Sequence, residues 1–187
     1  MAAPTRTDLI TVITDDHRDV ERVFAELESE PEAGNRKDVV DHVIAELVRH
    51  SVAEEQLMYP AARKHLDNGD EIADHEIEEH AEAEKVMKRL ERKNPGEPEY
   101  EELLGKLIAD VRHHIKDEEN DLLPRLREAC SAEELDQLGE RVLAAKKIAP
   151  TRPHPHAPSK PPPANLALAP GAAFVDKIRD ALTGRKS

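Results

Sequence analysis

The fold is decided by the stretch His50–Pro60, HSVAEEQLMYP, which returns at His114–Pro124 as HIKDEENDLLP. In both copies a histidine is followed four and five residues later by two glutamates, and ten residues later by a proline. Residues four apart on an α-helix lie one turn apart on the same face, so each histidine and the first glutamate after it point the same way. A solvated acidic helix can produce one such pair by accident. The repeat with its matching proline indicates a duplicated arrangement that faces inward.

A second motif repeats at nearly the same offset. His17-x-x-x-Glu21 returns 63 residues later as His80-x-x-x-Glu84, each followed by apolar residues at helical spacing, whereas the first motif repeats after 64. The chain therefore reads as two helical hairpins in tandem. A bundle of two such hairpins has an approximate twofold axis, and the matching histidines should meet near it.

Composition favours an all-α fold. The chain is 36% charged and 2% aromatic and is rich in good helix formers. Apolar residues recur at helical spacing in four segments, separated by Pro, Gly and Asn. The segments cover about 7–29, 36–65, 70–93 and 98–129. Their short connections predict an antiparallel up-down four-helix bundle over residues 1–130.

Three further parts follow the predicted bundle. Residues 131–148 read as a short fifth helix that packs on the bundle or extends it, begun by a capping box from Ser131 to Glu134. Residues 149–170 form a Pro-rich linker, expected to be extended and poorly packed. Residues 171–187 predict a basic amphipathic helix, which we expect to dock on the acidic bundle or on a protein partner rather than on a membrane.

The charge distribution excludes some partners. The net charge is −13, but residues 1–140 carry 18 Lys and Arg against 38 Asp and Glu. Such an acidic body does not suit nucleic acid and does suit cations. The only cysteine is Cys130, and we find neither a signal peptide nor an apolar stretch of bilayer length. These features predict a cytoplasmic protein.

The repeated spacing of histidine and glutamate points to metal binding. A lone histidine in a helix is usually at the surface or hydrogen-bonded in the core, but here four histidines and two glutamates share inner faces. Buried glutamate is rare unless it is paired or bound to metal. Such imidazoles and carboxylates suit a pair of transition-metal ions. The predicted ligands are His17, His50, Glu54, His80, His114 and Glu118.

These motifs, with Asp16-His17 and Glu79-His80, resemble the hemerythrin-like, or HHE, cation-binding domains over about residues 8–128. The resemblance implies two iron ions bridged by carboxylates and an oxygen atom, with iron favoured over manganese or zinc. It also implies a small-molecule partner: dioxygen, hydrogen peroxide or nitric oxide.

The sequence departs from the oxygen-carrying hemerythrins, which have a fifth histidine four residues before the one on the third helix. Here that position is Glu76, which is either a ligand or leaves a position to water. Glu21 and Glu84 could join the ligands or orient the histidine rings. His113 is expected at the surface or behind the ligands, and Tyr59 either packs or lies near the site.

Three functions remain open. The favoured one is redox turnover of catalase or peroxidase type, for which the carboxylate-rich site is better suited than for oxygen carriage; whether the protein is an enzyme is left uncertain. An iron or oxygen sensor, carrier or storage protein would use the same ligands without turnover. A plain helical interaction module would bind no metal.

Overall fold

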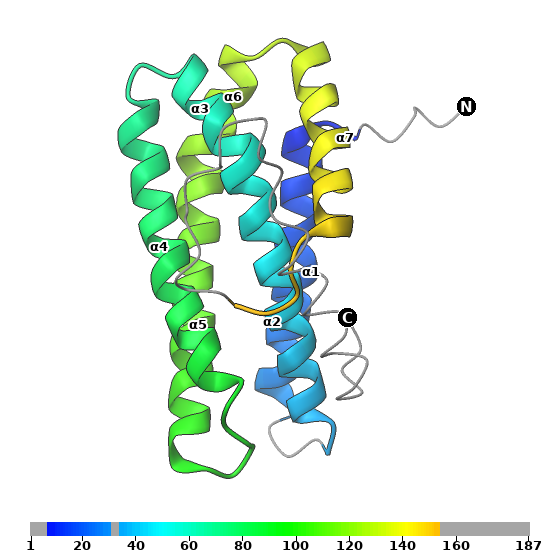
Figure 1. The fold of residues 1–187 in the computed structure, drawn as a ribbon, viewed down its shortest axis with the longest axis vertical. Coiled ribbons are helices and arrows are strands. Elements are labelled where there is room, and N and C mark those ends of the chain that lie inside the picture. The colour runs from blue at the N-terminus through cyan, green and yellow to red at the C-terminus, as the bar shows by residue number, and fades with distance from the viewer. Residues whose placement is uncertain (1–6, 31–33, 154–187) are drawn as a thin grey trace, which may run out of the picture.

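The structure is a computed structural model that describes residues 7–30 and 34–153, and within them every regular element is helical (Figure 1). Two of the four long helices of the bundle run through a short π-helical segment into a further α-helical piece. The elements are α1 (Leu9–Ser29), α2 (Arg36–Ala53) with η1 (Glu54–Met58) and α3 (Tyr59–His65), α4 (Gly69–Leu90), and α5 (Pro98–Asp117) with η2 (Glu118–Leu122) and α6 (Leu123–Ala129). The predicted all-α four-helix bundle is confirmed.

The two π-helical segments begin at the glutamates of the repeated motif. The Tyr59 N–H donates to the carbonyl of Glu54, and the Leu123 N–H donates to that of Glu118, five residues back in each case. Pro60 follows directly in the first helix. A proline has no N–H to donate and crowds the carbonyl four residues earlier, so a wider turn before it relieves the helix. The repeated proline is visible in the sequence, but the change of helix type before it was not predicted.

Two apolar cores stack along the bundle axis. One contains Leu9 and Ile13 of α1 with Met58 of η1, and the other contains Phe24 of α1 with Leu107 of α5. Between them lies a layer of buried polar side chains, to which each of the four long helices contributes a histidine. The apolar cores fix the helices on both sides of that layer, and the layer itself is the candidate site.

Helix α7 (Ala132–Ile148) packs against α1, α2 and η1, beside α1 in Figure 1. Ser131 caps it, because its hydroxyl accepts a hydrogen bond from the Glu134 N–H at 3.2 Å. Gly139 allows α7 to approach the start of α1 closely: a Cβ there would lie 1.9 Å from the carbonyl oxygen of Thr7. Helix α7 therefore covers the α1–α2 face of the bundle.

The first residues after α7 lie against α4. Arg152 pairs with Glu91 at 3.2 Å, and Lys88 Nζ donates to the carbonyl oxygen of Pro153 at 3.1 Å. This part of the predicted linker is thus packed, because it carries a cation and carbonyls that reach the polar end of α4. The rest of the predicted linker and the predicted terminal helix, residues 154–187, lie outside the described residues. Among the described helices, none has the length and apolar character needed to cross a membrane.

We predict that Gly139→Ala destabilises the protein by about 1–3 kcal/mol, because the added methyl group forces α7 away from the backbone of α1. Urea unfolding followed by circular dichroism measures the change. Gly105→Ala is the matched control: this position lies in α5 with no atom within 4 Å of an added Cβ. There we expect a gain of up to about 1 kcal/mol from helix propensity. Equal effects of the two changes would contradict the close approach.

Candidate metal centre

Four imidazoles surround two carboxylates in the polar layer. His50 Nε2 lies 2.9 Å from one carboxylate oxygen of Glu54, and His80 Nε2 lies 3.4 Å from the other. His17 Nε2 lies 3.3 Å from one carboxylate oxygen of Glu118, and His114 Nε2 lies 3.6 Å from the other. We call Glu54 and Glu118 the inner carboxylates; both side chains are fully buried. Each inner carboxylate thus lies between two histidines from different helices.

Several buried atoms of this layer have no hydrogen-bond partner. They are both carboxylate oxygens of Glu54, Oε2 of Glu118, Oε2 of Glu76 and Nε2 of His17. Imidazole nitrogens lie near these oxygens without forming well-aligned hydrogen bonds, and each buried polar group that lacks such a bond costs about 1–3 kcal/mol. A cation among these atoms would remove that cost. The donor set of imidazole nitrogen and carboxylate oxygen therefore fits transition-metal ions of the iron, manganese and zinc class.

The donor atoms fall into overlapping groups at the two ends of the layer. His17, His50, Glu54 and Glu118 form one group, with donor atoms all within 4.8 Å of one another. At the other end, His80 and His114 form a group with Glu54, and His114 also forms one with Glu76 and Glu118. Because the inner carboxylates belong to both ends, the arrangement suits two ions that share them.

An outer ring of acids orients the histidines. Nδ1 of His17 bonds Glu119 at 2.8 Å, and Nδ1 of His80 bonds Glu55 at 3.1 Å. A protonated Nδ1 that donates to a carboxylate leaves the Nε2 lone pair directed at the inner carboxylates, as metal binding requires. His50 and His114 are held in the same way, by Asp16 at 3.2 Å and Glu79 at 3.0 Å respectively. We call Asp16, Glu55, Glu79 and Glu119 the outer carboxylates.

Sequence reasoning assigned no role to the outer carboxylates, although a signal was present. Each one is adjacent in sequence to a predicted ligand, and the pairs repeat between the two hairpins. Each serves a histidine on a neighbouring helix rather than its own sequence neighbour: Asp16 belongs to α1 but bonds His50 of α2. Helical spacing defines the face of a residue but not which residue on the next helix it meets.

Two residues break the twofold repeat at the His80–His114 end. Glu76 Oε2 lies 2.9 Å from His114 Nδ1. Tyr59 is buried, donates to Glu118 Oε1 at 3.0 Å and lies 3.2 Å from His80 Nε2. The positions that correspond in the other half of the chain are Ile13 and Leu123. The two ends of the layer are therefore chemically different.

The remaining candidates lie further out. Glu21 pairs with Arg112 of α5 at 3.1 Å instead of orienting His17, whose Nδ1 already bonds Glu119. Within the described residues no hydrogen bond or ion pair joins Glu84 to His80. His113 is 62% exposed, and its Nε2 lies 3.5 Å from Glu79 Oε1.

Electrostatics in the layer favours charged histidine before metal is bound. Burial opposes the imidazolium of His50, but the carboxylates of Glu54 and Asp16 outweigh it and raise the pKa of His50 to about 10. Burial likewise opposes charge on His114, yet Glu118 and Glu76 hold its pKa well above the ordinary value. Burial also raises the pKa of Glu76. A metal ion binding here must displace protons from imidazole.

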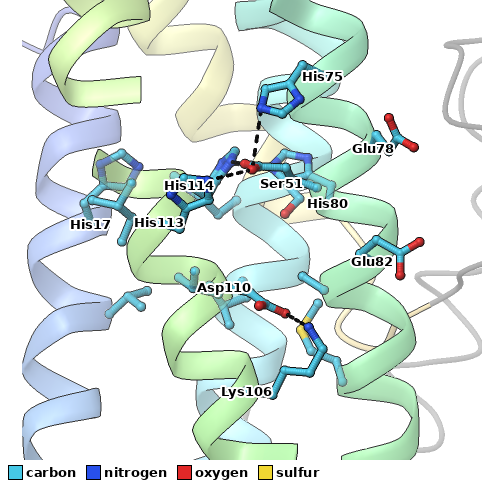
Figure 2. A pocket seen from close by; sticks show the side chains of 18 residues that line it. His17, Ser51, His75, Glu78, His80, Glu82, Lys106, Asp110, His113 and His114 are labelled. Carbon is cyan, nitrogen blue, oxygen red and sulfur yellow. Dashed lines mark hydrogen bonds and ion pairs between the residues drawn. The ribbon is translucent and has the colours of Figure 1, made fainter. Parts of the chain in front are cut away.

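A cavity of about 360 Å³ connects the layer to the surface. Its inner end is lined by His17, His50, His80 and His114, and Figure 2 shows three of these rings with His75 and His113 nearby. Its walls are mainly apolar, including Val20, Leu47, Met87, Val111 and Ile115. Small uncharged molecules can therefore reach the imidazoles without a polar cost from the walls.

Comparison with known proteins agrees with this geometry. The family description Hemerythrin HHE cation binding domain matches residues 8–126. An uncharacterised hemerythrin-like protein of Schizosaccharomyces pombe is 30% identical over 93% of this chain and 86% of its own length. A DNA nickase of Nostoc is 28% identical over 72% of this chain, which spans only 38% of that protein.

One solved structure shares the fold. It is a hemerythrin HHE cation-binding domain-containing protein from Mycobacterium kansasii, with a TM-score of 0.65 and 23% identity. The match covers 75% of this chain and 85% of that one.

We predict that metal affinity rises with pH. Because the pKa of His50 is raised to about 10, its imidazole is protonated at pH 7 and must release that proton to bind metal. One released proton gives about a tenfold gain in affinity per pH unit below that pKa. Manganese titrations at pH 6, 7 and 8 measure the slope, with His42→Ala, an exposed histidine of α2, as the control. An affinity independent of pH would contradict the protonated site.

Proposed function

Because the chain belongs to the hemerythrin HHE cation-binding family, we propose that it is a non-haem di-iron protein that reacts with a small oxygen or nitrogen species. The observation that carries the proposal is the pair of fully buried inner carboxylates, each between two imidazoles. Four histidines and two shared carboxylates would hold one iron at each end of the polar layer. Imidazole and carboxylate donors accept iron, manganese and zinc alike, and membership of the hemerythrin HHE family favours iron.

Iron bound there supplies a Lewis acid and a store of electrons. The chain itself does the rest of the work. The outer carboxylates hold the four rings in one tautomer and make them better donors. The cavity leads from the surface to the four imidazoles and admits dioxygen, hydrogen peroxide or nitric oxide. Burial raises the pKa of Tyr59 well above its ordinary value, so its hydroxyl stays protonated and can donate beside Glu118.

Turnover of peroxide is favoured over reversible oxygen carriage. Glu76 occupies the position of the fifth histidine and lies within reach of His114 and Glu118, so that end of the layer is richer in carboxylate. Carboxylate ligands favour the oxidised state of iron, which suits redox cycling. An iron or oxygen sensor, carrier or storage protein with the same ligands is the alternative. The cytoplasmic setting remains a prediction, as does docking of residues 171–187.

We predict that the protein binds two ferrous ions per chain under anaerobic conditions and that His114→Ala binds one or fewer. Removing this imidazole takes a donor from both groups at its end of the layer. Glu118→Gln, which keeps the shape of the side chain, should lose iron in the same way. His42→Ala should keep both ions. Iron analysis after desalting measures the content, and circular dichroism shows that each variant is folded. Normal iron content in His114→Ala and Glu118→Gln would contradict the assignment of these residues as iron ligands.

Dioxygen and peroxide separate the two functions. We expect the iron-loaded protein to develop a visible absorption band with dioxygen that persists after the gas is removed, and to evolve oxygen from hydrogen peroxide. A band that disappears with the gas, without peroxide turnover, would instead favour the carrier or sensor. Absence of any spectral change in protein that retains no iron would contradict the di-iron proposal.

A further inference from the structure

Four side chains with metal-binding groups meet on the exposed side of α4 and α5, outside the ligand set described above. His75 Nε2 lies 3.6 Å from Glu79 Oε1, and His113 Nε2 lies 3.5 Å from the same oxygen. His113 Nε2 also lies 3.5 Å from Asp117 Oδ2. Donor atoms of His75, Glu79 and Asp117 all fall within 4.8 Å of one another. We call these four residues the rim cluster, because three of them line the cavity.

The spacing in the rim cluster suits a shared ion better than hydrogen bonds. Separations of 3.5 and 3.6 Å are at or beyond the limit for a hydrogen bond. Donors bound to one tetrahedral ion at about 2.1 Å lie about 3.4 Å apart. An imidazole with two carboxylates is also a donor set that first-row transition metals accept, and His113 lies beside it as a further imidazole. Both histidines are more than half exposed, so an ion there would exchange readily with solvent.

The internal repeat offers an independent comparison. Glu79 of α4 corresponds to Asp16 of α1, and each uses one oxygen to hold the Nδ1 of a ligand histidine. The other oxygen of Asp16 pairs with the ammonium group of Lys146 from α7. The other oxygen of Glu79 faces His75 and His113. Helix α7 covers only one of the two equivalent faces. On that face Asp16 has a lysine of the protein as its cation, whereas on the other face the corresponding oxygen of Glu79 faces two histidines that can bind a metal cation.

Charge around the cavity mouth also favours a cation. Glu78, Glu82 and Asp110 line the mouth with Glu79. Lys106 pairs with Asp110 at 2.6 Å (Figure 2) and Lys85 pairs with Glu82 at 2.6 Å, so the excess negative charge lies on Glu78 and Glu79. An acidic opening attracts metal cations and raises their local concentration. The same cavity continues from the rim cluster to His80 and His114.

We propose that the rim cluster is a loading site, which captures one divalent first-row transition-metal ion at the cavity mouth and delivers it to the buried layer. Glu79 connects the two places, since one of its oxygens faces the rim and the other holds His114. The delivery step rests on the proposed di-iron function. Capture of an ion at the rim does not.

Zinc titration tests capture. The double variant His75→Ala/His113→Ala changes only exposed positions, and Glu79 and the buried ligands stay intact. Calorimetric titration of the iron-loaded protein with Zn²⁺ should show one ion per chain that the double variant lacks and His42→Ala retains. If the protein holds no iron, the di-iron proposal fails. The loading site is then tested by titrating metal-free protein with Zn²⁺, and wild type should still bind one more Zn²⁺ than the double variant. Equal zinc binding by wild type and double variant would overturn the loading site.

The rate of iron uptake tests delivery. Ferrous iron is mixed with metal-free protein, and the fraction that resists a fast ferrous chelator is followed with time. The double variant should load several-fold more slowly than wild type and His42→Ala, because the rim no longer holds an ion beside the cavity while the acidic mouth is unchanged. Its final iron content should equal that of wild type. An unchanged rate would show that the rim has no part in loading.

Discussion

The whole structure depends on two carboxylates buried midway along a helical bundle. Glu54 and Glu118 lie between two apolar cores, where an uncompensated charge is strongly unfavourable. Imidazoles from four helices compensate it, and the outer carboxylates in turn fix those imidazoles. The inner carboxylates therefore need the imidazoles, and the imidazoles need the outer carboxylates. The apolar cores then hold the helices in the register that brings these groups together.

The repeated motifs were enough to predict the helices and the six residues that line the layer, because a four-residue spacing defines one face of a helix. They were not enough for contacts between helices. Glu21 shares a face with His17 yet meets Arg112, and the residues that do orient the rings come from neighbouring helices. Tyr59 was harder still, since the π-helical segment before it changes the direction of every side chain that follows.

The two halves of the bundle differ at a few positions, and these differences show where the site carries extra functional groups. Helix α7 covers one face only, and the apolar Ile13 and Leu123 correspond to Glu76 and Tyr59. Tyr59 of the first hairpin and Glu76 of the second both reach the His80–His114 end of the layer, which is therefore more polar than the His17–His50 end. The scaffold is duplicated, whereas the extra functional groups lie at one end of the layer.

The sharing of contacts between hairpins has a consequence for protein design. Each hairpin brings two of the four histidines and one inner carboxylate, and its outer acids serve both itself and the other hairpin. Two copies of the α4–α5 hairpin, associated about the same axis, would present the complete set of donors. A homodimer of one helical hairpin would thus carry every type of donor that this layer contains.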